Sequence, residues 1–92
     1  MRFDAGTETA SGQISDTRDR VLSIEFHARS TNSGSVYFGR TDVTNINGRE
    51  MTAGEAVTLT FSDKETEASV LFSFFYVDVP SGNLMDWTVI LA

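Results

Sequence analysis

VLSIEFHARS, residues 21–30, alternates apolar and polar side chains. The apolar ones fall on every second position: Leu22, Ile24, Phe26 and Ala28. A period of two predicts a β-strand with one face in a core and the other in water.

The same alternation recurs on either side of this stretch. AVTLTFS (56–62) and LMDWTVILA (84–92) predict two further strands, and SVYFG (35–39) predicts a short one. Asn47-Gly48 is a strong turn signal. The sequence therefore predicts an all-β chain, folded as a single antiparallel β-sandwich or a small β-barrel with an extended N-terminal arm. Its expected core includes Leu22, Ile24, Phe26, Val57, Leu59, Phe61, Trp87 and Val89.

Residues 70–79, VLFSFFYVDV, are apolar at positions of both parities. As a continuous strand, this segment would place Val70, Phe72, Phe74 and Tyr76 on one face and Leu71, Phe75 and Val77 on the other. A strand with two apolar faces needs a cover on each. We expect another subunit or the N-terminal arm to cover one face, with Phe72, Phe74 and Tyr76 as candidate partner-binding residues. The preceding SDKETEAS (62–69) is expected to be a charged loop.

Residues 1–20, MRFDAGTETASGQISDTRDR, form the predicted arm, and residues 21–92 form the predicted β-sandwich domain. The arm is polar except for Met1, Phe3 and Ile14. Phe3 and Ile14 are therefore the expected anchors if the arm docks on a neighbouring protein by strand addition.

Charge and composition exclude several partners. The chain has 92 residues, 13 acidic against 7 basic, and a net charge of −6. This balance disfavours binding to nucleic acid or to an anionic membrane. The chain has no cysteine, which excludes disulfides and thiolate metal sites. No apolar stretch is long enough to span a bilayer as a helix, and no secretory leader is evident, so we expect synthesis in a cytoplasm.

No catalytic constellation is visible. His27 is the only histidine and falls on the wet face of its strand. The aspartates lack the spacing of a calcium loop, and the glycines lack that of a phosphate loop. We expect no catalytic, cofactor-binding or metal-binding residues, although sequence alone leaves a paired-carboxylate glycosidase open. We expect five aromatic side chains to belong to the core, and the alternative is that they form a platform for sugars or bases. They are Phe72, Phe74, Phe75, Tyr76 and Trp87.

SIEFHARSTNSGSVYFGRTDVTNINGREMTAGEAVTLTF, residues 23–61, resembles a pattern found in small phage virion proteins. Met51 stands where leucine is more usual. The matching positions are Val36, Tyr37, Gly39, Val43, Gly48, Met51, Gly54, Glu55, Val57 and Leu59. The resemblance implies a small β-sandwich in a virus particle.

On this basis the expected function is that of a non-catalytic structural protein of a phage virion. We expect a capsid decoration, or cement, protein that binds and stabilises the head. The alternatives are a tail or head-tail joining component, or a module that binds carbohydrate on a host surface. The expected partners are the major capsid protein or another virion protein, together with further copies of the chain, for which a trimer is one arrangement. The expected location is the virion, after synthesis in the host cytoplasm.

Overall fold

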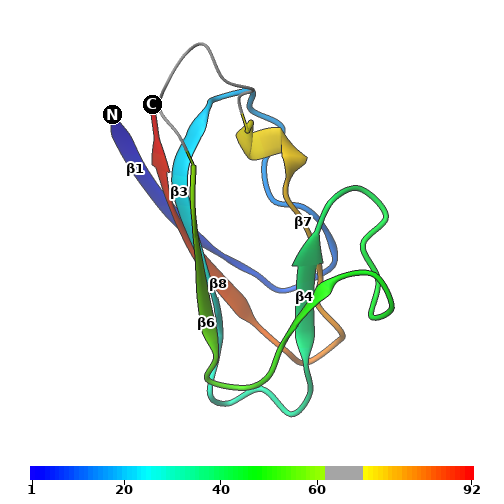
Figure 1. Ribbon diagram of the computed structural model, residues 1–92. Helices are drawn as coiled ribbons and strands as arrows, with labels where there is room; N and C mark the ends of the chain where they lie inside the picture. Colours follow the sequence, from blue (N-terminus) through cyan, green and yellow to red (C-terminus); the bar gives the residue numbers. More distant parts are fainter. Residues whose placement is uncertain (62–69) are drawn as a thin grey trace.

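The computed structural model describes residues 1–61 and 70–92; the predicted charged loop at 62–69 lies outside the described residues. In the described ranges, two four-stranded antiparallel sheets face each other as a sandwich (Figure 1). The all-β prediction is confirmed, and the two sheets form an open sandwich instead of a closed barrel.

The first sheet has the strand order β1-β8-β3-β6, and the second has the order β2-β7-β4-β5. The first sheet consists of β1 (Arg2–Glu8), β8 (Met85–Leu91), β3 (Val21–Ala28) and β6 (Ala56–Thr60). The second consists of β2 (Gly12–Gln13), β7 (Tyr76–Asp78), β4 (Val36–Gly39) and β5 (Arg49–Met51). Neither sheet could exclude water alone, so the apolar inner face of each requires the other.

The core lies between the sheets and is built around aromatic contacts. Phe26 on β3 stacks on Phe38 of β4, with ring centroids 4.3 Å apart. The ring of Phe75 also packs against Phe26, with ring centroids 5.9 Å apart. Seven of the eight predicted core residues are buried or pack against the core. Ile24, Phe26, Trp87 and Val89 are buried, and Val57, Leu59 and Phe61 are partly buried. The exception is Leu22.

Leu22 was placed in the core by the alternation, and this prediction is wrong. The pairing of β3 with β8 shifts register between Val21 and Ser23, which marks a bulge. A bulge inserts one extra residue and resets the phase of the side chains. As a result Val21 is fully buried, and Leu22 is only half-buried.

The prediction of one continuous strand over residues 70–79 is also wrong. Phe72–Phe74 forms a single 3-10 turn, in which Phe75 N–H donates to the carbonyl of Phe72 at 3.3 Å. The turn breaks the alternation, so Phe72 is buried whereas Phe74 is 49% exposed. The segment therefore does not present one aromatic face, and the strand β7 begins only at Tyr76.

The first twenty residues pair with both sheets of their own chain. β1 runs antiparallel to β8 along its whole length, and β2 pairs with β7. Arg2 and Asp19, near the two ends of this segment, form an ion pair at 2.6 Å. The segment is polar because β1 is an edge strand, and an edge needs few apolar side chains.

Candidate docking surface

The structure does not bring the five predicted partner-binding residues together. Phe3 is 69% exposed on β1, and Ile14 packs against the core of its own chain. Phe72 is buried, so we now assign both Ile14 and Phe72 to the core. Phe74 and Tyr76 lie on the side of the second sheet, where both line hollows beside the same loop.

This loop spans residues 40–48 and connects β4 to β5. One hollow beside it is lined by Arg40, Thr41, Ser73 and Phe74. Another lies next to Tyr76, with Ser11, Gly12, Thr41, Asp42, Val43 and Val77 in its wall. A third is lined by Phe38, Gly39, Arg40, Thr41, Val43, Asn47 and Arg49. The 40–48 loop is therefore flanked by hollows, and concave surface of this kind is where proteins bind other molecules.

Internal hydrogen bonds hold the 40–48 loop in one shape. The amide oxygen of Asn47 accepts from the backbone N–H of Thr44 at 2.7 Å, and the Thr44 hydroxyl accepts from the N–H of Ile46 at 3.2 Å. Gly48 N–H donates to the carbonyl of Thr44 at 2.9 Å. Asp42 has φ 64°, a conformation that aspartate tolerates better than most residues. These bonds satisfy loop backbone groups locally, as Asn and Thr side chains do in turns.

Two glycines and a valine set the base of the loop. A Cβ on Gly48 would lie 2.6 Å from Cγ2 of Val43 and 2.9 Å from the carbonyl oxygen of Thr44. A Cβ on Gly39 would lie 3.0 Å from the same Val43 methyl. Val43 therefore packs into the space that the two missing side chains leave, and the loop closes over its own apolar residue.

Ile46 lies in this loop with 90% of its surface exposed. Sequence reasoning missed it, because the alternation arguments addressed strands and treated 40–50 as a connection. The available signal was an isoleucine inside a run of turn-forming residues, NING, where nothing in a core requires one. A fixed loop that exposes a large apolar side chain can insert it into a pocket of another protein at little cost in conformational entropy.

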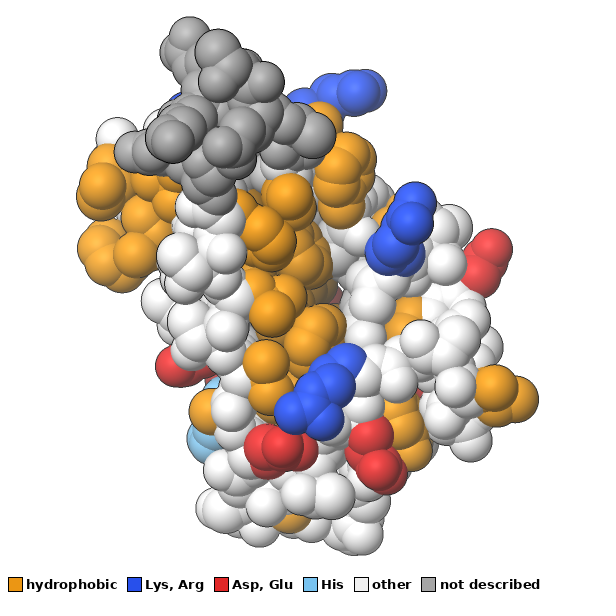
Figure 2. Space-filling view, viewed as in Figure 1, with side chains coloured by type: hydrophobic (Ala, Val, Ile, Leu, Met, Phe, Trp, Pro, Cys, Tyr) orange, Lys and Arg blue, Asp and Glu red, His pale blue; other side chains and the backbone are white. Residues whose placement is uncertain are grey.

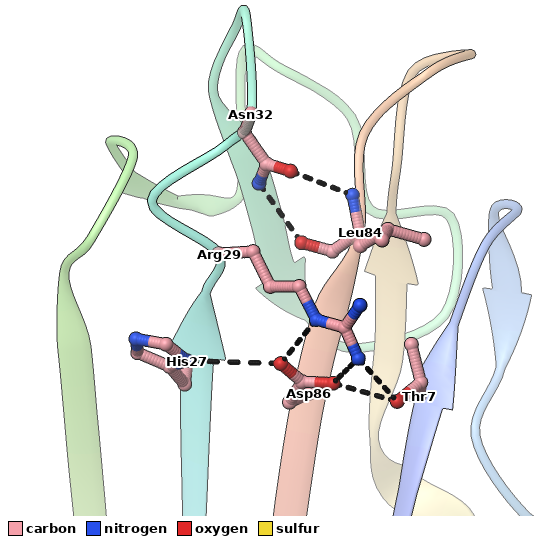
Figure 3. A network of polar contacts seen from close by, with 6 residues as sticks. All are labelled: Thr7, His27, Arg29, Asn32, Leu84 and Asp86. Atoms are coloured by element: carbon pink, nitrogen blue, oxygen red, sulfur yellow. Dashed lines mark hydrogen bonds and ion pairs between the residues drawn. The ribbon is translucent and has the colours of Figure 1, made fainter.

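Apart from the loop, a cluster of polar side chains lies on the outer side of the first sheet, where β1, β3 and β8 run side by side (Figure 3). Asp86 accepts two hydrogen bonds from Arg29, at 2.8 Å and 2.9 Å, and one from the hydroxyl of Thr7 at 2.6 Å. His27 Nδ1 lies 3.7 Å from the same carboxylate. The hydrogen bonds from Arg29 lower the pKa of Asp86 to about 2, with a smaller contribution from Thr7 in the same direction.

Nearby, the side chain of Asn32 joins the loop after β3 to the start of β8. Its amide accepts from Leu84 N–H at 2.8 Å and donates to the Leu84 carbonyl at 2.8 Å. Asp86 is held by three hydrogen bonds and has a pKa of about 2, so its carboxylate is a weak base at neutral pH. The cluster therefore acts as a clamp that fixes β1 and the chain after β3 against β8.

Among the described residues, the acidic and histidine side chains form no group of three that could hold a metal ion. Within the same ranges, no helix has the length and apolar character needed to cross a bilayer. The 40–48 loop with Phe74 and Tyr76 is thus the candidate functional site. Comparisons with protein-family models, with curated proteins and with solved structures found no match for this chain.

Proposed function

We propose that this protein is a non-catalytic structural protein of a phage particle, a decoration protein that binds the head through the 40–48 loop. One observation carries the proposal: the loop is fixed by its own hydrogen bonds and presents Ile46 with 90% of its surface exposed. The partner is the major capsid protein or another protein of the particle surface.

The energetics of such a contact are favourable although it is small. Burying an isoleucine that is otherwise exposed contributes about 1.5–3 kcal/mol. Phe74, which is 49% exposed beside Arg40 and Thr41, adds apolar area next to the loop. Each contact is weak by itself, and linked copies on a repetitive surface gain affinity from multivalency.

The resemblance to small phage virion proteins supports a particle as the partner. It spans residues 23–61 and so includes the whole loop. Three of the matching positions, Gly39, Val43 and Gly48, are the residues that pack together at the base of the loop.

The hollow beside Tyr76 favours a second candidate, binding of carbohydrate on a host surface. Its wall includes the carboxylate residue Asp42 and the hydroxyl residues Ser11 and Thr41 next to the Tyr76 ring. Sugars bind where an aromatic ring meets such hydrogen-bonding groups. A position in the tail, where host surfaces are met, would accompany this function.

Rebinding to particles tests the proposal. Particles of the phage that encodes the chain are stripped of it, incubated with purified protein and sedimented. We expect the wild type to sediment with the heads, and Ile46→Asp to bind at least tenfold more weakly because a charge enters the contact. Ala53→Asp adds the same charge at an exposed turn elsewhere and should bind like the wild type.

Three results would contradict parts of this proposal. Equal binding by Ile46→Asp would show that the loop is not the docking surface. Failure of the wild type to bind any particle would exclude the decoration function. Labelling of the tail by antibodies against the chain would favour the tail or host-surface alternatives.

A further inference from the structure

The sandwich has four edge strands in the described ranges, and three of them are poor templates for another strand. The pairing of β1 with β8 places Arg2, Asp4 and Glu8 on the core-facing side of an edge, where charges block addition. β2 has two residues. β5 has three, of which Arg49 and Glu50 are charged.

The fourth edge, β6, lacks these protections. Its five residues, AVTLT, contain no charge and no proline. Val57, Leu59 and the following Phe61 are only partly buried, although they pack against the core. Figure 2 shows the resulting stripe of hydrophobic side chains between β6 and the second sheet. The side chains of Thr58 and Thr60 lie on the opposite, outer side.

Within residues 1–61 and 70–92, β6 pairs with β3 and with no other strand, so one edge of its backbone has no strand partner there. Ala28 N–H donates to the carbonyl of Glu55, and Phe61 N–H donates to that of Leu22, each at 2.9 Å. In an antiparallel pair, hydrogen-bonding residues alternate along each strand. The odd-numbered residues of β6 therefore point their backbone groups at β3, and Ala56, Thr58 and Thr60 point theirs away from the sheet.

We propose that β6 pairs with β6 of a second copy of this chain, antiparallel and about a two-fold axis at Thr58. In this register Thr58 lies opposite Thr58 of the second copy, and Ala56 lies opposite Thr60. All three outward N–H groups and all three outward carbonyls of each strand then find partners. On the core side, Val57 lies opposite Leu59 of the second copy, so the two apolar stripes join and cover each other.

This register keeps like charges apart. Glu55 of one copy lies opposite Phe61 of the other, so the two Glu55 residues are about 20 Å apart along the strands. That separation exceeds the screening length of about 8 Å at physiological salt. A head-to-tail pairing of β6 with β1 would instead place Arg2, Asp4 and Glu8 against the apolar stripe. The pairing is therefore isologous and closes at two copies. It does not rest on the proposed binding to particles, because it occurs in solution.

Sedimentation equilibrium of the full chain tests the pairing, with two matched variants. Glu25 on β3 has a threonine opposite it on each neighbouring strand: Thr58 on the edge strand β6 and Thr88 on the central strand β8. Both threonines lie on the outer face of the sheet. Thr58→Lys puts like charges directly opposite each other across the two-fold axis, and Thr88→Lys adds the same charge away from the edge. We expect the wild type and Thr88→Lys to reach twice the 10.1 kDa chain mass as concentration rises, while Thr58→Lys stays at the monomer mass. Circular dichroism verifies that both variants are folded.

Disulfide trapping tests the register, since the chain has no cysteine of its own. Cysteines at position 58 of two copies would have Cα atoms about 5.5 Å apart, within reach of a disulfide. Cysteines at position 60 would be about 14 Å apart and out of reach. We expect oxidation to link Thr58→Cys into dimers and to leave Thr60→Cys monomeric. A wild type that is monomeric or trimeric, a dimeric Thr58→Lys, or equal linking of the two cysteine variants would each overturn the proposal.

Discussion

The indole of Trp87 lies directly against Gly6, across the pairing of β8 with β1: a Cβ on Gly6 would lie 2.6 Å from Cζ2 of Trp87. The same indole donates its N–H to Glu8 at 3.1 Å and packs edge-on to Phe72, with centroids 5.3 Å apart. The polar strand β1 therefore packs against Trp87, the one tryptophan of the chain, through Gly6 and Glu8. A position that looks like a loop glycine in the sequence is the place where a large ring needs room.

Replacement of Gly6 by alanine should lower the free energy of unfolding by about 1–3 kcal/mol, because the methyl group would overlap the indole of Trp87 and force it to shift. Urea denaturation measures the change. Gly34→Ala is the matched control, since a Cβ there meets only Asn83 Nδ2 at an ordinary 3.8 Å. Equal midpoints for the two variants would mean that β1 does not press on Trp87.

Truncation of core residues should distinguish the centre of the sandwich from its β6 edge. Phe26→Ala should lower the free energy of unfolding by about 3–5 kcal/mol, because Phe26 is fully buried and stacks on Phe38. Leu59→Ala should cost only about 1–2 kcal/mol, since Leu59 is partly exposed in the monomer. The measurement is urea denaturation at a concentration low enough to keep the chain monomeric. A larger loss for Leu59→Ala than for Phe26→Ala would contradict the burial described here.

Local alternation was sufficient to predict much of the fold. In β3 and β8 every second residue is apolar, and each strand has one wet face, so Ile24, Phe26, Trp87 and Val89 were predicted correctly as core. The errors arise where the pairing of segments far apart in the sequence determines which side chains face the core. The bulge that buries Val21 in place of Leu22 exists only in the pairing of β3 with β8.

The error over residues 70–79 has the same origin. The 3-10 turn at Phe72–Phe74 resets the alternation of an apolar run, and composition gives no signal for it. β1 is polar because it lies at an edge, and a strand of that composition forms only because β8 offers its backbone. Of the candidate site, Phe74 and Tyr76 were predicted. Ile46 was missed, because its exposure depends on hydrogen bonds within the loop.

Stability at low pH should report on the clamp at Asp86. The folded pKa of Asp86 is about 2, below its ordinary value of 3.8, because Arg29 donates hydrogen bonds to the ionised form. The stabilisation from this carboxylate is therefore complete above pH 3.8 and is lost as the pH falls towards 2. Asp86→Asn should flatten the pH dependence of unfolding in that window.

The same clamp can be followed by NMR titration of the Asp86 carboxyl group. Thr7→Val removes a hydroxyl that lies 2.6 Å from the carboxylate and should raise the pKa of Asp86, because that hydrogen bond favours the charged form. An unchanged pKa in Thr7→Val would contradict the role given to this contact.

Two substitutions in the 40–48 loop should distinguish a residue that stabilises the chain, Gly48, from one that serves binding, Ile46. Gly48→Ala should destabilise the chain, because its Cβ would lie 2.9 Å from the backbone oxygen of Thr44, which cannot move away without opening the loop. Ile46→Asp should change the free energy of unfolding by less than about 0.5 kcal/mol, as substitutions of exposed side chains do. Thermal unfolding of both variants measures this. A large loss of stability in Ile46→Asp would show that Ile46 packs against its own chain.

The central claim is that this chain binds the head of a phage particle through the 40–48 loop. Its most direct test is a cryo-electron microscopy reconstruction of virus particles purified from cells that make the chain. The account predicts density for the sandwich on the outer surface of the head, with the side chain of Ile46 in a pocket of a capsid subunit. A reconstruction in which the sandwich is absent from the head, or is attached with the 40–48 loop facing solvent, would contradict it.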